Sequence, residues 1–184
     1  MSREVHVLRE VEVPENVVVE INGMKVVVKG PKGSLERDFS HARGVRIRKE
    51  NSKILVETYF ANRKKKALVG TIAAHIRNMI TGVTKGYRYK LKIMFSHFPI
   101  SVKIDKSRNM VVIANFLGEK APRTATILEG VDVTVKGSDV IVEGIDIEKV
   151  GQTAANIESA CKVQGLDRRV FLDGIYIYEK GVAE

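Results

Sequence analysis

The sequence predicts an α+β protein built from two tandem homologous domains, each an antiparallel sheet packed on one main helix. The first observation is an internal repeat, because residues 69–76 (VGTIAAHI) recur 81 residues later as residues 150–157 (VGQTAANI). Both copies have the apolar spacing of an amphipathic helix. Short runs rich in β-branched residues precede each copy. Strands followed by a helix are typical of α+β domains rather than of alternating βαβ units.

The first half opens with a predicted hairpin. Two valine-rich runs, residues 17–21 and 24–29, flank Asn22-Gly23, a dipeptide that accepts the positive φ of a tight turn. Gly30-Pro31-Lys32-Gly33 then forces a second turn. The remaining strands of this half are expected at residues 34–39, 45–48, 54–56 and 87–94, the last of them closing the first domain after its helix.

The second half repeats this order. Val13-Pro14 is echoed by Phe98-Pro99 at an offset of 85 residues, and Gly44-Val45 by Gly130-Val131 at an offset of 86. Duplication of one domain is the most economical explanation of these ordered echoes. We therefore expect a first domain at residues 1–96 and a second at residues 97–184, joined by a short linker. Strands are expected at residues 100–104, 110–114, 131–135, 140–143, 170–171 and 175–178.

The predicted second helix covers residues 150–163 and ends through Gly165 as its C-cap. Cys161 falls on the apolar stripe of this helix, so we interpret it as a small core residue. The tail that follows is expected to turn at Asp173-Gly174 as a hairpin. A single cysteine excludes an internal disulfide and suits a reducing, intracellular compartment.

The composition favours a polyanionic partner. The chain of 184 residues is 44% hydrophobic, which is enough for packed cores, and its net charge is +9 with a pI near 9.7. Residues 1–96 carry 20 Lys plus Arg and 9 Asp plus Glu, whereas residues 97–184 carry 11 and 13. We find neither a signal peptide nor an apolar run of membrane-spanning length. We therefore expect a soluble protein that is not exported.

The motifs argue against an enzyme. Gly30 to Ser34 lacks the full phosphate-loop pattern, and its Gly-x-x-Gly is flanked by predicted strands rather than by the helices of a KH domain. The four histidines, at positions 6, 41, 75 and 97, are scattered and stand near no metal or nucleophile motif. Asp146 and Glu148 alternate along one run, as on a solvated face. We therefore expect no catalytic residues, no metal, no cofactor and no small-molecule substrate.

Two basic groups stand out in the first half. Arg63 is followed by Lys64, Lys65 and Lys66 at a helix N-terminus, where the macrodipole disfavours cations and a bound anion would relieve the conflict. Arg88, Lys90 and Lys92 occupy alternate positions of one predicted strand and so share a face. Either group suits contacts with RNA phosphates, although a basic helix entry is usually solvated charge.

The second half has its own basic groups. Lys120 and Arg123 lie in a turn-rich connection, where loop decoration is an equal interpretation. Lys162, Arg168 and Arg169 cluster where the second helix ends, and Lys180 comes two residues after the last predicted strand. We interpret this cluster as a binding end.

These residues resemble a known family. The duplicated domain, the Gly-Pro-Lys-Gly-Ser-Leu turn at residues 30–35, the Val-Gly-x-x-x-Ala helices and the ending Arg-Val-Phe-Leu-Asp-Gly-Ile-Tyr at residues 169–176 are similar to large-subunit ribosomal protein six. This family is called protein nine in many eukaryotic lists, and the ending resembles its archaeal and eukaryotic branch. The resemblance spans nearly the whole chain.

The resemblance implies two homologous α+β domains and a non-enzymatic role in the cytoplasmic large ribosomal subunit. The implied partners are large-subunit ribosomal RNA near the stalk base and the sarcin-ricin loop, and neighbouring ribosomal proteins, with no membrane. The family's second domain is its main RNA anchor. Carried over to this sequence, the anchor falls on Lys162, Arg168, Arg169 and Lys180, and on Lys120 with Arg123.

Charge and resemblance point to different halves, since the first half carries more net charge. A few cations at fixed positions set the register of the protein on RNA, whereas diffuse positive charge mainly strengthens nonspecific binding. The second half can therefore hold the specific anchor although the first half carries more net charge. With few aromatic residues near the basic groups in the sequence, we expect recognition through shape and phosphates rather than base stacking. The alternative is an intracellular protein-interaction module with no RNA role.

Overall fold

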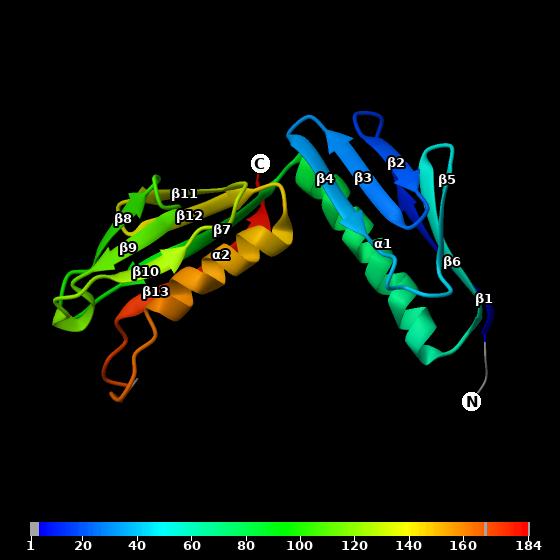
Figure 1. The fold of residues 1–184 in the computed structure, drawn as a ribbon. Coiled ribbons are helices and arrows are strands. Elements are labelled where there is room, and N and C mark those ends of the chain that lie inside the picture. Colours follow the sequence, from blue (N-terminus) through cyan, green and yellow to red (C-terminus); the bar gives the residue numbers. More distant parts are fainter. Residues whose placement is uncertain (1–3, 168, 184) are drawn as a thin grey trace. The chain divides into compact units, whose positions relative to one another are not determined.

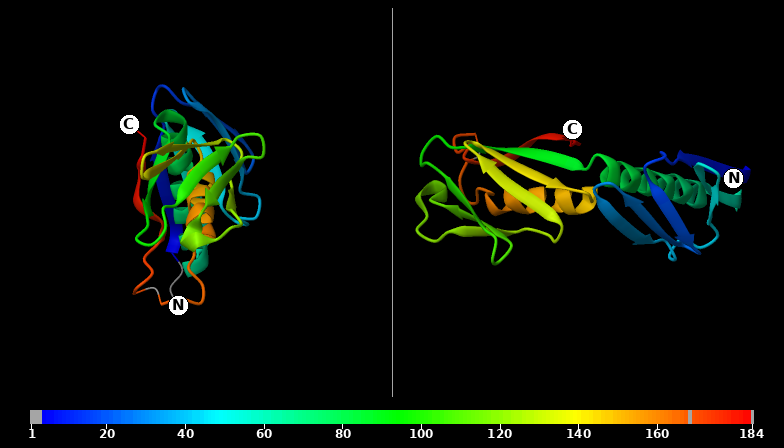
Figure 2. Two further views of the ribbon diagram at one scale, coloured as in Figure 1. Left: turned by 90° about the vertical axis from the view of Figure 1, so that its left-hand side faces the viewer. Right: turned by 90° about the horizontal axis from the view of Figure 1, so that it is seen from above.

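The computed structural model describes residues 4–167 and 169–183 and divides the chain into two compact units (Figure 1). Unit 1 is Met1–Lys85 and unit 2 is Gly86–Glu184. In each unit one long helix lies along its own antiparallel sheets, as the two further views in Figure 2 also show. This arrangement confirms the predicted duplicated α+β architecture.

Unit 1 has two three-stranded sheets, with strand orders β1-β6-β5 and β2-β3-β4. All neighbouring strands are antiparallel. The elements described in this unit are β1 (Glu4–Glu12), β2 (Val18–Asn22), β3 (Lys25–Gly30), β4 (Gly33–Asp38), β5 (Arg46–Glu50), β6 (Lys53–Ala61) and α1 (Arg63–Thr84).

Unit 2 repeats this plan and adds one strand. Its sheets have the orders β11-β12-β7-β13 and β10-β9-β8, so that β7-β12-β11 corresponds to β1-β6-β5. The elements described in this unit are β7 (Tyr87–Met94), β8 (Ser101–Asp105), β9 (Met110–Ala114), the 3₁₀ turn η1 (Phe116–Gly118), β10 (Arg123–Thr126), β11 (Val131–Lys136), β12 (Asp139–Gly144), α2 (Ile147–Ala160) and β13 (Gly174–Val182).

The predicted domain boundary near Ser96 differs from the structure. Strand β7 does not close the first domain but opens the second, because it pairs with β12 on one side and with β13 on the other. Among the described residues, unit 1 therefore has no closing strand after α1, whereas in unit 2 the strand β13 follows α2. The chain divides after Lys85 instead.

The predicted β2–β3 hairpin is confirmed, with its turn one residue later than expected. Asn22 pairs with Lys25, so Gly23 and Met24 form the two-residue loop, and Gly23 supplies the positive φ of 64°. The next turn packs on the end of α1. The Lys32 N–H donates to the Val83 carbonyl at 3.0 Å, and a Cβ on Gly30 would lie 2.7 Å from Val83 Cγ2.

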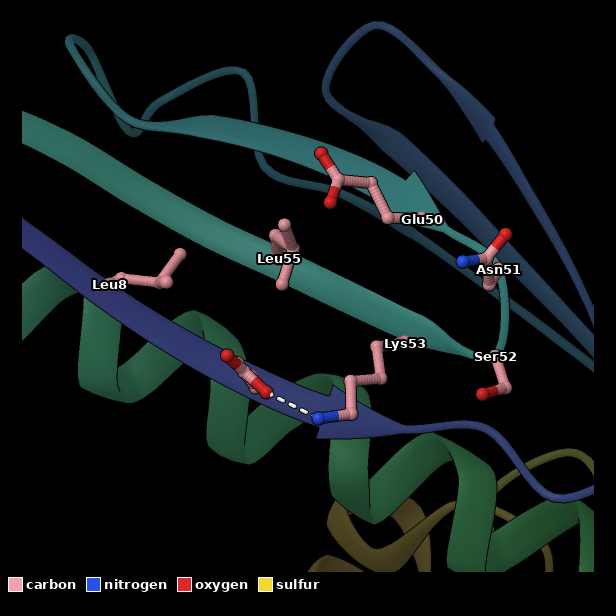
Figure 3. A pocket seen from close by; sticks show the side chains of 7 residues that line it. Leu8, Glu50, Asn51, Ser52, Lys53 and Leu55 are labelled. Atoms are coloured by element: carbon pink, nitrogen blue, oxygen red, sulfur yellow. Dashed lines mark hydrogen bonds and ion pairs between the residues drawn. The ribbon is translucent and has the colours of Figure 1, made fainter.

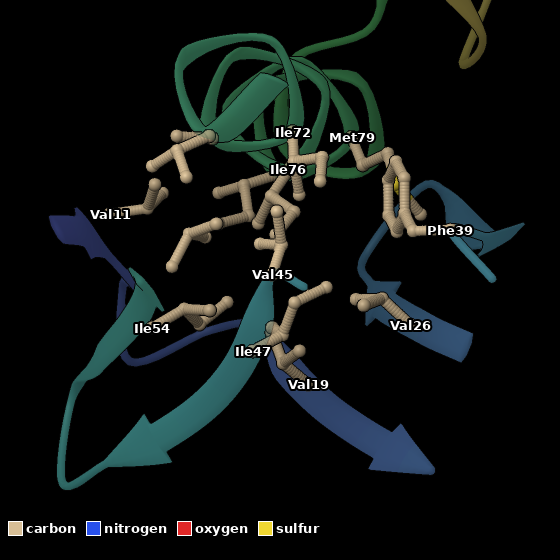
Figure 4. Packing of buried hydrophobic residues seen from close by; sticks show 14 of the residues in the cluster. Val11, Val19, Val26, Phe39, Val45, Ile47, Ile54, Ile72, Ile76 and Met79 are labelled. Atoms are coloured by element: carbon tan, nitrogen blue, oxygen red, sulfur yellow. The ribbon is translucent and has the colours of Figure 1, made fainter. Parts of the chain in front are cut away.

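Helix α1 covers the core of unit 1. Asn62 caps its N-terminus, because the Asn62 side chain accepts a hydrogen bond from the Lys65 N–H at 2.9 Å. The buried face of α1 carries Ile72, Ile76 and Met79. In Figure 4 these side chains point down between the two sheets, towards Ile54 of β6 and other labelled side chains such as Val11, Val26 and Ile47.

Helix α2 packs on unit 2 in the same way. Asp146 caps it through the Glu148 N–H, and the helix ends at Ala160 rather than at the expected Val163. Gly165 has a positive φ of 73° but lies beyond the helix, so its predicted capping role is wrong. Asp173 and Gly174 do not form the predicted hairpin, since Asp173 is buried and Gly174 already begins β13. The strand expected at residues 170–171 is absent from the described secondary structure.

Cys161 lies in the core of unit 2, as predicted. It follows the last residue of α2, and burial raises the pKa of its thiol to about 11. A thiol with such a pKa stays protonated and unreactive at neutral pH.

Candidate nucleic-acid interface

Three connections meet at one end of unit 2, which we call the basic end (Figure 1; Figure 2). They are residues 95–100 after β7, residues 115–122 around η1, and the described residues 161–167 and 169–173 between α2 and β13. Hydrogen bonds join them. The Asn115 side chain donates to the Pro99 carbonyl at 3.0 Å, and Arg123 Nη1 donates to the Lys162 carbonyl at 3.1 Å. His97 Nδ1 lies 2.7 Å from the carboxylate of Asp173. These contacts bring segments far apart in the sequence to one surface.

Asp173 is the anchor of the last connection. Its carboxylate accepts hydrogen bonds from the Ser96 N–H at 2.8 Å and the His97 N–H at 3.2 Å, in addition to the His97 ring. Burial alone would raise the pKa of Asp173, but the His97 ring and the two backbone N–H groups outweigh it and lower the pKa to about 2. The carboxylate is therefore charged at neutral pH. Phe171 stacks on the His97 ring at 4.6 Å between centroids and adds an apolar contact to this anchor.

Arg123 fixes the beginning of the same connection. Its guanidinium donates to both oxygens of Glu119, at 2.8 and 2.6 Å, and Nη1 donates to the Ala160 and Lys162 carbonyls at the end of α2. The guanidinium carbon also lies 4.3 Å from the centroid of the Phe116 ring. The hydrogen bond to Glu119 raises the pKa of Arg123. Arg123, a predicted RNA contact, is thus engaged with the protein itself.

Three predicted cations at the basic end are exposed: Lys120, Lys162 and Arg169. Their ammonium or guanidinium groups make no hydrogen bond or ion pair within residues 4–167 and 169–183. Arg168, also predicted, lies outside the described residues. Lys180 is exposed but belongs elsewhere, because it pairs in register with Tyr89, towards the end of β7 that begins unit 2, and its Nζ lies 6.0 Å from the Tyr89 ring.

Arg88, Lys90 and Lys92 share one face of β7, as predicted, but each meets an acid on a neighbouring strand. Arg88 pairs with Glu143, Lys90 with Glu179 at 2.9 Å, and Lys92 with Asp139 at 3.1 Å. From the sequence alone this face of β7 was expected to carry three unpaired cations. The three ion pairs neutralise it.

Lys64, Lys65 and Lys66 lie in the first turn of α1 in unit 1, as predicted, and no acidic residue accompanies them there. Lys65 is half-buried, and its Nζ lies near Gly44. Asn62, which the sequence analysis did not single out, satisfies one backbone N–H of this turn.

The open face of the β1-β6-β5 sheet carries a buried carboxylate, Glu57. Arg48 donates to it at 2.5 Å and His6 Nε2 at 3.2 Å. Burial would raise the pKa of Glu57, but the His6 and Arg48 contacts outweigh it and lower the pKa below its usual value. This cluster stabilises the sheet and leaves no carboxylate poised for proton transfer.

A shallow pocket lies further along the same face, lined by Leu8, Leu55 and the β5–β6 turn (Figure 3). The ion pair between Lys53 and Glu10, at 2.7 Å, crosses it. Within the described ranges no group of three or more His, Cys, Asp or Glu residues is arranged to hold a metal ion. In the same ranges no helix is long and apolar enough to cross a membrane.

The structure also reveals aromatic residues that the sequence analysis missed. Phe95 and Phe98 are about half exposed, at 51% and 47%, and both belong to the connection after β7 at the basic end. The expectation that few aromatic residues lie near the basic groups is therefore wrong. The sequence signal that could have indicated this exposure is Phe98-Pro99. It lies in a segment without the alternation of a strand, where an apolar side chain is less often buried.

Comparison with known proteins identifies the family. The family model described as ribosomal protein L6 matches the chain twice, over residues 13–86 and 98–174, once in each unit. The chain belongs to the ribosomal protein L6 family. This assignment confirms the predicted family and duplication, and it confirms that the chain is a structural, non-enzymatic protein.

Members of the L6 family match this chain along almost its whole length. A large ribosomal subunit protein uL6 from Staphylothermus marinus is 68% identical over 180 residues, covering 97% of both chains. The uL6 protein from Desulfurococcus amylolyticus is 64% identical over 183 residues and covers 100% of both. The uL6 protein from Methanococcus vannielii is 53% identical over 171 residues, covering 93% of this chain and 92% of its own.

Proposed function

We propose that this chain binds large-subunit ribosomal RNA through the basic end of unit 2, near the stalk base and the sarcin-ricin loop, and supports the factor-binding region during translation. Membership of the L6 family makes the chain a structural constituent of the cytoplasmic large ribosomal subunit. The RNA site and its residues are the parts that we propose. The exposed cations Lys120, Lys162 and Arg169 would contact phosphates, and Arg168 would join them.

The observation that carries the proposal is the way the protein holds these cations. Arg123 fixes the backbone at Lys162, and Asp173 fixes the segment that follows Arg169. Cations held on an ordered backbone lose less conformational entropy when they bind phosphate than cations on a free chain do. Such a surface is suited to docking in one register.

The observed unit boundary sharpens the comparison of charge. Residues 1–85 carry 17 Lys plus Arg and 9 Asp plus Glu, whereas residues 86–184 carry 14 and 13. Unit 1 therefore supplies most of the diffuse positive charge, including Lys64, Lys65 and Lys66. We assign it an auxiliary, salt-sensitive role, and the ion-paired Arg88, Lys90 and Lys92 a structural one.

The test compares two pairs of exposed cations in the full chain. Lys162→Ala with Arg169→Ala removes two charges from the basic end, and Arg63→Ala with Lys64→Ala removes two from the first turn of α1. Binding to large-subunit ribosomal RNA is titrated at several salt concentrations with nonspecific RNA as competitor. The first variant should lose competitor-resistant binding at least tenfold, and its log-log salt slope should fall by about 1.4 to 1.8.

The second pair should weaken binding to the competitor and to ribosomal RNA alike. If instead it abolished specific binding while the first pair left it unchanged, the anchor would lie in unit 1. Hydroxyl-radical footprinting of the bound RNA would then locate the contact. If the protected nucleotides lay away from the stalk base and the sarcin-ricin loop, the proposed location of the RNA contact would be wrong.

A further inference from the structure

Phe98 is an apolar side chain that the fold does not use in its core. Its residue is 47% exposed, and it is absent from both the buried cluster of unit 2 and the half-buried side chains that pack on that cluster. Single exposed apolar residues are common on protein surfaces and need no explanation by themselves. What distinguishes Phe98 is the rigidity of its surroundings.

The backbone of Phe98 is fixed on both sides. On one side the His97 N–H donates to the buried Asp173 carboxylate at 3.2 Å, and the His97 ring is held by the same carboxylate. On the other side Pro99 restricts the φ and ψ of the residue before it, and the Pro99 carbonyl accepts from Asn115 at 3.0 Å. A buried carboxylate thus orders a segment whose next side chain points to solvent.

The Phe98 ring packs against Gly118. A Cβ on Gly118 would lie 3.4 Å from two atoms of the ring and 3.6 Å from a third, so the bare backbone of η1 provides the surface against which the ring packs. Gly118 has a positive φ of 77°, a conformation that favours glycine. Lys120, exposed, follows two residues later.

We propose that Phe98 is a stacking platform for an unpaired base of the bound RNA, with Lys120 neutralising a neighbouring phosphate. The inference rests on the proposed function and adds base recognition to it. An aromatic ring held rigidly beside exposed cations matches how proteins bind single-stranded RNA, where bases stack on rings while phosphates meet Lys and Arg. A protein partner fits less well, because lysine is depleted at protein–protein interfaces.

The test uses three substitutions of Phe98 in the full chain. Phe98→Ala and Phe98→Leu should each weaken binding to large-subunit ribosomal RNA by about 5- to 150-fold, whereas Phe98→Tyr should stay within about twofold of the parent. The salt slope should not change, because no phosphate contact is lost. Phe60→Ala is the matched control, since Phe60 in unit 1 is 66% exposed, and it should bind as the parent does.

A spectroscopic test is also open, because the chain contains no tryptophan. Phe98→Trp introduces a single indole whose emission should be quenched when a base stacks on it, and Phe60→Trp should show no comparable quenching on binding. Circular dichroism and thermal unfolding verify that each variant is folded.

The inference would be overturned by unchanged binding of Phe98→Ala, by full binding of Phe98→Leu, or by an indole whose emission RNA does not quench. Loss of assembly with ribosomal proteins alongside unchanged RNA binding would indicate a protein partner and would overturn it too. The Lys162→Ala Arg169→Ala variant is measured in parallel. It distinguishes failure of the stacking role of Phe98 from failure of the proposed RNA anchor. If that variant alone loses binding, the anchor stands and only the stacking role fails.

Discussion

The carboxylate of Asp173 lies 2.7 Å from Nδ1 of His97, a residue 76 positions earlier in the chain, and only 1% of the Asp173 side chain is exposed. This pair joins the connection after β7 to the segment before β13. Both segments belong to the basic end, so the stability of the pair and the shape of the proposed RNA surface are linked.

We predict that Asp173→Asn destabilises the protein by about 2 kcal/mol at pH 7. The folded pKa of about 2 lies below the ordinary value of 3.8, so the charged carboxylate stabilises the fold above pH 3.8, and this stabilisation is lost as pH falls through about 2. Denaturant unfolding at pH 7, 4 and 2 measures it. The difference between parent and variant should shrink over the acid range, whereas Asp132→Asn, at an exposed position, should show no such trend.

A second prediction concerns Arg123. Arg123→Ala removes the hydrogen bonds to Glu119 and to the two carbonyls at the end of α2, so the free energy of unfolding should fall by about 1 to 3 kcal/mol. RNA affinity should fall as well, because the backbone at Lys162 loses its hydrogen bond to the guanidinium. The log-log salt slope of RNA binding should stay unchanged.

That slope distinguishes the two possible roles of Arg123. If the guanidinium contacted a phosphate directly, the slope would fall by about 0.7 to 0.9. A double-mutant cycle with Lys162→Ala and Arg169→Ala adds a second criterion. In that background a residue that only positions these cations should lose most of its effect on binding.

The third prediction uses two glycines of unit 1. Gly30→Ala should destabilise unit 1 by about 1 to 3 kcal/mol, because the new Cβ would lie 2.7 Å from Val83 Cγ2 and 2.9 Å from the Val83 carbonyl oxygen. Gly70→Ala should stabilise it by about 0.5 to 1 kcal/mol, since Gly70 lies within α1 and its added methyl group meets nothing within 4 Å. Thermal unfolding of both variants measures the contrast. Equal shifts would show that the Gly30 turn does not pack on the helix.

The fourth prediction concerns Glu57. Glu57→Ala should lower the free energy of unfolding by about 1 to 3 kcal/mol, because Arg48 and His6 lose their shared acceptor. RNA affinity measured under conditions where the variant is folded should remain that of the parent. A loss of affinity comparable to that of the Lys162→Ala Arg169→Ala variant would move part of the interface to this face.

Much of the fold could be predicted from local sequence patterns. The helix repeat at residues 69–76 and 150–157, the Asn22-Gly23 hairpin and the family motifs predicted the duplicated α+β plan. The assignment of β7 failed because a strand's alternation says nothing about which sheet will hold it. Only pairing with β12 and β13, set by residues about fifty to ninety positions later, decides that.

The candidate site was less accessible from sequence. Lys120, Lys162 and Arg169, predicted as RNA contacts, are exposed. Their charge in the sequence did not distinguish them from Arg88, Lys90 and Lys92, whose acidic partners lie on other strands. Arg123 is equally basic in sequence and yet is engaged with Glu119 and backbone carbonyls. The buried ion pair of Asp173 and the exposure of Phe98 were not predicted, because burial and the exclusion of an apolar side chain from the core are tertiary properties.

The pairing of β7 with β13 also determines the order in which the two units can fold during synthesis. In unit 1 every strand partner of β1 has been made once α1 is complete. In unit 2 the first strand must wait for the last, since the Ala183 N–H donates to the Gly86 carbonyl at 2.9 Å. Long-range pairing of this kind slows folding. We therefore expect the N-terminal unit to fold while the chain is still emerging, and the proposed RNA-binding surface to form only after β13 has emerged.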